Sequence, residues 1–174
     1  MKFVIGLIVG LLILPIFGYL YINYGFLPVS VADLPFPYER NITRIPLKAR
    51  IKREAPKTAP IQATDDNFVE GAKIYRAQCM VCHGQPGKQS RFAEAMFPKA
   101  PQLWEKEGDH TGVSDDPPGY TYWQVRNGIR LTAMPSFTHM LDDTQMWQVS
   151  LLLANADKPM AAPVQEELAK HARE

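Results

Sequence analysis

The only two cysteines of this chain lie in the stretch QCMVCHG, at residues 78–84. Cys79 and Cys82 are followed directly by His83, so two thiols and an imidazole are concentrated within five residues. A disulfide between these cysteines would close a very small loop and would constrain little of the unfolded chain. A thioredoxin-like redox pair belongs beside a βαβ pattern, which the sequence lacks. A structural zinc site needs a fourth ligand, which would have to come from His110, His139 or a carboxylate.

Covalent haem attachment explains all three residues and their order. In C-x-x-C-H, the thiols add to the two vinyl groups of the porphyrin, and the adjacent imidazole reaches the iron from the same side. We therefore expect one covalent haem c, held by Cys79, Cys82 and His83. This attachment is made outside the cytoplasm, so the motif also predicts an exported domain.

The occupant of the sixth iron site decides between electron transfer and chemistry at an open iron. The candidates are Met96, His110, Met134, His139, Met140, Met146 and Met160, or none of them. Met134 stands in NGIRLTAMPSF, directly before Pro135, which holds the preceding residue extended. This favours Met134 as a loop ligand, with His139 and Met140 as the next candidates. An open sixth site would instead indicate a haem enzyme or a gas sensor.

The N-terminus carries an uncharged apolar run from Phe3 to Ile22. As a helix this run spans about 30 Å, the thickness of a bilayer core. Tyrosines near its end suit a membrane interface. We predict that residues 1–24 form an uncleaved anchor. The alternative is a signal peptide cleaved at the small residues Ser30-Val31-Ala32, although that site lies well beyond the apolar run.

Residues 25–63 form a proline-rich, basic segment, which predicts an extended tether. Residues 1–60 hold eight Lys/Arg and three Asp/Glu, a net charge of +5, but nothing forms the concentrated basic face of a nucleic-acid binder. The tether is also unusually apolar for a spacer, which favours docking on a partner subunit or on its own domain. Its basic residues would equally suit anionic lipid headgroups.

Helical patterns dominate residues 64–158, so this domain is predicted to be all-α. Apolar residues from Phe68 to Cys79 recur at three- and four-residue spacing and predict a helix that ends at the motif. Short helices are predicted over residues 91–97 and 122–127, the latter ended by Gly128. Asp142 and Gln145 predict a capping box for the last helix. Residues 159–174 are predicted to form a polar C-terminal tail.

The stretch from about Thr64 to Asp157 resembles the class I cytochromes c, the small single-haem electron carriers. The resemblance rests on QCMVCHG, KAPQL, TYWQVRNGIRLTAMPSF and DDTQMWQVSLLLANA. It implies a few helices around one haem, with the first and last helices crossing where Gly71, Tyr75 and Trp147 match the family.

The resemblance also assigns roles to individual residues. It implies that Met134 is the distal ligand opposite His83, and that the Pro101 carbonyl orients the proximal imidazole. Trp123 and Asn127, with Arg126 between them, are implied to contact the haem propionates or to frame the methionine loop.

A site closed by His and Met transfers single electrons and does no bond chemistry, so we expect no enzymatic activity of its own. The long anchored N-terminus resembles that of membrane-tethered cytochromes of bacterial respiratory chains and of cytochrome subunits of dehydrogenases or oxidases. The expected partners are membrane lipid, an electron donor and an electron acceptor. The expected location is the inner membrane, with the haem domain on the periplasmic side.

Overall fold

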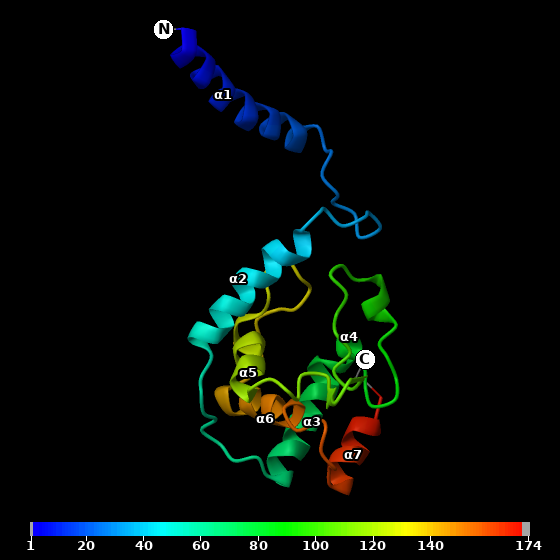
Figure 1. Cartoon of the computed structure of the whole chain (residues 1–174). Coiled ribbons are helices and arrows are strands. Elements are labelled where there is room, and N and C mark those ends of the chain that lie inside the picture. The colour runs from blue at the N-terminus through cyan, green and yellow to red at the C-terminus, as the bar shows by residue number, and fades with distance from the viewer. Residues whose placement is uncertain (1, 172–174) are drawn as a thin grey trace. The chain divides into compact units, whose positions relative to one another are not determined.

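The computed structural model describes residues 2–171, which are mainly helical (Figure 1). The chain divides into two compact units, with the boundary after Thr43. The α-helices are α1 (Lys2–Asn23), α2 (Glu39–Glu54), α3 (Asp65–Gln78), α4 (Met80–His83), α5 (Pro118–Asn127), α6 (Asp143–Leu153) and α7 (Ala162–Ala169). A 3-10 turn, η1 (Phe92–Ala95), and a hairpin of β1 (Lys106–Glu107) and β2 (His110–Thr111) complete the secondary structure.

The first unit contains α1, a helix of 22 residues that is long and apolar enough to cross a membrane. Its large apolar side chains are exposed along its length, so the helix does not contribute to a protein core. Pro15 lies inside the helix without ending it. A membrane anchor and a signal sequence share these properties.

Helix α2 shows that the expectation of an extended tether was wrong over residues 39–54. Pro46 lies inside this helix, where it removes one backbone hydrogen bond. The following residues include strong helix formers, and Arg50 Nε lies 3.0 Å from Glu54 Oε2 at the stabilising i,i+4 spacing. Local propensity after the proline therefore outweighs the proline's effect.

The end of α2 and the segment after it fold back on the domain, as one of the two docking hypotheses proposed. We call residues 51–61 the strap. Ile51 is only 4% exposed, and the Trp123 indole of α5 donates to Glu54 Oε2 at 3.3 Å. Hydrogen bonds from Arg53 and Arg50 lower the pKa of Glu54 to about 2, so this acceptor is ionised. The Pro56 carbonyl lies directly over Gly119 of α5.

Replacing Gly119 with alanine is expected to detach the strap. A Cβ at this position would overlap the Pro56 carbonyl oxygen, so either the strap or α5 must move. Such overpacking costs about 1–3 kcal/mol. Hydrogen exchange should accelerate across residues 51–61 and remain slow in α6, and uniform acceleration of both segments would contradict a local detachment.

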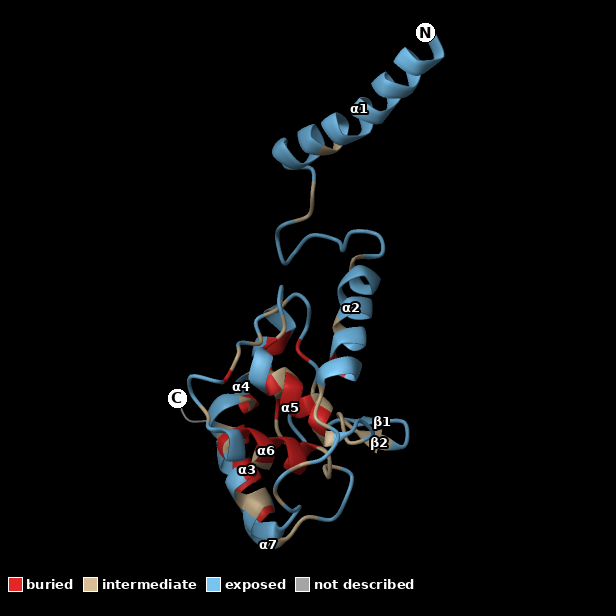
Figure 2. Ribbon diagram, turned by 90° about the vertical axis from the view of Figure 1, so that its left-hand side faces the viewer, coloured by how far each residue is buried: buried red, intermediate tan, exposed pale blue. Residues whose placement is uncertain are grey.

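The core of the second unit lies where α3, α5 and α6 meet, and in Figure 2 all three helices carry stretches coloured as buried. Tyr75 and Leu152 are completely buried, and the Tyr122 and Trp147 rings stack with centroids 4.2 Å apart. Gly71 permits the close crossing of α3 and α6 because the Gln148 backbone occupies the space of a side chain. The predicted crossing of first and last helices of the cytochrome domain is therefore present.

Helix ends follow the predicted signals closely. Asp142 accepts from the Gln145 backbone N–H while the Gln145 side chain accepts from the Asp142 N–H, which confirms the capping box. Thr64 caps α3, and Gly128 ends α5 with a φ of 66°. The helix predicted over residues 91–97 is the shorter 3-10 turn η1.

Helix α7 contradicts the prediction of a polar tail after residue 158. Val164 and Leu168 are buried, and their four-residue spacing gives this short segment an apolar side. Glu167 faces the core and accepts a hydrogen bond from Arg76 Nε of α3 at 2.7 Å. An acidic residue that reads as solvent-exposed in the sequence is thus the partner of a cation on another helix.

Removing the Glu167 carboxylate is expected to destabilise the domain by about 3 kcal/mol, because Arg76 would stay buried without a partner. The Glu167 side chain is 6% exposed and the Arg76 side chain is 11% exposed. Hydrogen bonds from Lys170 and Arg76 lower the pKa of Glu167. Its contribution is therefore present above the pKa of an unfolded glutamate, about 4.3, and is lost as pH falls below it.

Urea unfolding of Glu167→Ala and wild type at pH 7 and pH 3 tests both statements. The difference in free energy of unfolding between wild type and Glu167→Ala should be smaller at pH 3 than at pH 7. Glu70→Ala removes an exposed ion pair with Lys73 and should change the free energy of unfolding by less than about 1 kcal/mol. If Glu167→Ala and Glu70→Ala lowered the free energy of unfolding equally, the buried Arg76–Glu167 pair would not contribute more than an exposed one.

Candidate haem-binding site

The two thiols are placed by the junction of α3 and α4. Cys79 is the C-cap of α3 and the N-cap of α4. Its carbonyl accepts a hydrogen bond from the His83 N–H at 2.9 Å. Both cysteines are partly exposed free thiols. Burial raises the pKa of Cys79 to about 12 and also raises the pKa of Cys82, so both are neutral thiols at pH 7. The helical turn therefore presents two unpaired sulfur atoms beside one imidazole.

The His83 imidazole is oriented by the Pro101 carbonyl oxygen, which lies 2.8 Å from Nδ1. A carbonyl can only accept, so Nδ1 carries the proton and Nε2 keeps its lone pair. Burial lowers the pKa of His83, against the opposing effect of this hydrogen bond, and the ring stays neutral. The tautomer is the one in which Nε2 is a metal donor.

The backbone of the motif is tied to the core on both sides. Tyr75 Oη donates to the Gly84 carbonyl at 2.7 Å, and the Leu103 N–H donates to the His83 carbonyl at 3.1 Å. Gly84 has a φ of 72°, which favours glycine and turns the chain sharply after His83. The segment from Pro101 to Leu103 therefore lies against the C-x-x-C-H motif.

Met134 lies in a loop that is fixed by backbone contacts to the end of α5. The Ile129 N–H donates to the Met134 carbonyl at 3.1 Å, and Met134 N–H donates to Thr132 Oγ1 at 3.1 Å. Ser136 Oγ donates to the Arg126 carbonyl at 2.6 Å. The methionine is partly buried against the core.

The structure places the other α5 residues outside that loop. Trp123 directs its indole N–H to Glu54 of the strap, and Asn127 Nδ2 donates to the Trp123 carbonyl at 2.8 Å. The Arg126 side chain binds Tyr122 and Asp143. Of the expected residues, His83 and Pro101 are in direct contact, and Arg126 supports the methionine loop through its carbonyl.

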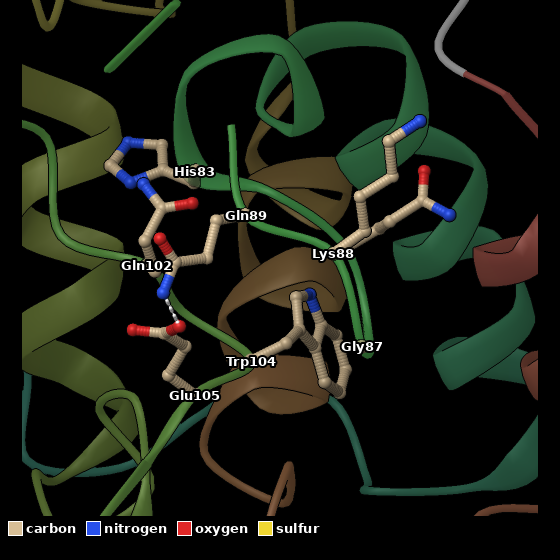
Figure 3. A pocket seen from close by; sticks show the side chains of 8 residues that line it. His83, Gly87, Lys88, Gln89, Gln102, Trp104 and Glu105 are labelled. Atoms are coloured by element: carbon tan, nitrogen blue, oxygen red, sulfur yellow. Dashed lines mark hydrogen bonds between the residues drawn. The ribbon is translucent and has the colours of Figure 1, made fainter. Parts of the chain in front are cut away.

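A polar cavity of about 290 Å³ lies beside His83 and was not predicted (Figure 3). Its lining includes His83, Gln85, Lys88, Gln102, Trp104 and Glu105. The buried Trp104 Nε1 has no hydrogen-bond partner within residues 2–171. Gln102 stands in the quoted segment KAPQL, between Pro101 and Leu103, but its sequence position alone does not reveal its contacts.

The donor set fits a covalent haem. Two free thiols, a neutral imidazole with an available Nε2 and a loop thioether are the groups that such a cofactor requires. The hydrogen-bonded imidazole tautomer is the observation that supports this fit most directly.

Comparison with known families supports the same assignment. Residues 66–151 match the family model described as cytochrome C oxidase, cbb3-type, subunit III. Searches of the curated proteins and of the solved structures returned no match. The matched range runs from the start of α3 into α6 and contains the thiol pair, His83 and Met134. The chain therefore carries a cytochrome c domain of class I.

Proposed function

We propose that this protein is a membrane-anchored c-type cytochrome that transfers single electrons through one haem. Cys79 and Cys82 would form the thioether bonds, with His83 and Met134 as the axial ligands. The observation that carries this proposal is the His83–Pro101 hydrogen bond at 2.8 Å, directly after the thiol pair. It leaves the imidazole in the tautomer that a haem iron requires.

The residues of the chain support electron transfer in three ways. His83 is held by Pro101 and by the backbone of α4, so its ring keeps one orientation in both oxidation states. Met134 is held by its loop contacts, and a thioether ligand favours reduced iron. When bound, the haem supplies an iron that gains or loses one electron without bond chemistry. With both ligands in place, the chain excludes substrates from that iron.

Membrane attachment through α1 is the second part of the proposal. The helix has the length and composition of a span, and an uncleaved anchor would concentrate the haem domain near membrane partners. The haem domain would then lie on the periplasmic side of the inner membrane. The matched family is named for an oxidase subunit, which supports a role as a cytochrome subunit of a respiratory complex as well as that of a mobile carrier.

Spectroelectrochemical titration of the full-length, haem-loaded protein tests the proposal. We expect a single one-electron wave, a low-spin spectrum in both states and no binding of carbon monoxide by the reduced protein. A high-spin iron that binds carbon monoxide readily would favour catalysis or gas sensing instead. Intact mass and carbonate extraction of membranes test the anchor: the cleaved-signal alternative predicts a shortened chain that is released.

A further inference from the structure

Gln102 joins three parts of the haem-binding site through one side-chain amide. Its Oε1 accepts from the Ser90 N–H at 2.7 Å. Its Nε2 donates to the Cys82 carbonyl and to the Ala100 carbonyl, both at 3.2 Å. The amide therefore connects the attachment motif, the loop before η1 and the segment that carries Pro101.

The Gln102 amide occupies the space that a side chain at position 84 would need. A Cβ on Gly84 would lie 2.5 Å from Gln102 Oε1, so the residue after His83 must lack a side chain for Gln102 to reach its partners. Ser90, which binds the amide, is also buried. Gln102 and His83 both line the polar cavity (Figure 3).

The anchored amide acts on the hydrogen bond of the imidazole through the backbone. The Pro101 carbonyl and the Gln102 N–H belong to one planar peptide unit, so rotation of this unit would swing the oxygen away from His83 Nδ1. The Gln102 side chain holds one side of this unit through Ala100 and Cys82. The Leu103 N–H holds the other side through the His83 carbonyl.

We propose that Gln102 is the positioning residue of the proximal ligand: it fixes the Pro101 carbonyl on His83 and thereby sets how strongly the imidazole donates to the iron. This inference rests on the proposed His83 ligation. A firm hydrogen bond raises the basicity of the imidazole and stabilises ferric iron. Loss of the amide therefore shifts the equilibrium toward ferrous haem.

Gln102→Met in the haem-loaded full chain tests the proposal, because it keeps the length of the side chain and removes all three hydrogen bonds. At a fixed solution potential, the ferrous-to-ferric ratio should rise about tenfold, equivalent to ~59 mV. Exchange of the His83 Nδ1 proton, followed by NMR, should accelerate. Gln165→Met is the matched control, since Gln165 is exposed on α7 and its amide donates only to the Met160 backbone carbonyl, outside the cavity beside His83.

Four further results separate the proposed role of Gln102 from the proposed function. A folded Gln102→Met with wild-type potential and proton exchange overturns the proposal while leaving the proposed function intact. If that variant does not fold, Gln102→Glu decides through Nδ1 proton exchange, because it keeps the acceptor for Ser90 but loses both donated bonds. In the wild type, rapid exchange of the Gln102 amide protons overturns the proposal, whereas a wild type without histidine ligation overturns the proposed function itself.

Discussion

Gly71→Ala is expected to separate α3 from α6 and to lower the thermal stability of the haem-loaded protein strongly. The new Cβ would lie 2.5 Å from the Gln148 carbonyl oxygen and 3.2 Å from Leu152 Cβ. The clash involves backbone, which cannot rotate away as a side chain can. Overpacking of about 3 kcal/mol, less about 1 kcal/mol gained in helix propensity, leaves a net loss of about 2 kcal/mol.

Thermal unfolding followed by circular dichroism measures this loss, which corresponds to about 4–8 °C. Gln78→Ala is the control, because Gln78 is exposed on the same helix. We expect its midpoint to equal that of the wild type. A Gly71→Ala protein with the wild-type midpoint would show that the helices do not cross at this distance.

Gly128→Ala is expected to move the loop that carries Met134, the proposed distal ligand. Gly128 has a φ of 66°, and a Cβ there would lie 2.7 Å from the Pro135 carbonyl carbon and the Ser136 nitrogen. The Met134 carbonyl oxygen would be 2.9 Å away. The loop must move to relieve these contacts, so the weak far-red ferric band of methionine ligation should disappear and the reduction potential should fall.

Gly87→Ala separates this displacement from the cost of the backbone conformation. Gly87 has a similar φ of 73°, but a Cβ there meets no atom within 4 Å. Both variants lose about 1–2 kcal/mol from the left-handed conformation, and only Gly128→Ala should lose the methionine band. Retention of the band in both variants would contradict the role of Gly128 in holding the loop.

The parts of the fold that were predicted from sequence depend on residues close together in the chain. Asp142 and Gln145 are three positions apart and cap each other, and Gly128 ends α5 through its own backbone conformation. The attachment motif is equally local. Such signals need no knowledge of the tertiary structure.

The parts that were missed depend on distant partners. Pro46 suggested an extended tether, but α2 continues through it and the strap beyond packs on Gly119 and Trp123. Glu167 makes the sequence of α7 look polar, but its carboxylate is buried against Arg76 of α3. The contacts of Gln102 cannot be predicted locally for the same reason, because its amide binds residues up to 20 positions away.

Absorption spectra of the full-length, haem-loaded protein with and without Met134 test the central proposal most directly. For the wild type, a closed His/Met site predicts a sharp reduced α-band and a weak far-red ferric band. Met134→Ala should lose the far-red band, show a lower reduction potential and bind carbon monoxide when reduced. A wild type that is high-spin and binds carbon monoxide, or a Met134→Ala spectrum identical to that of the wild type, would contradict ligation by Met134.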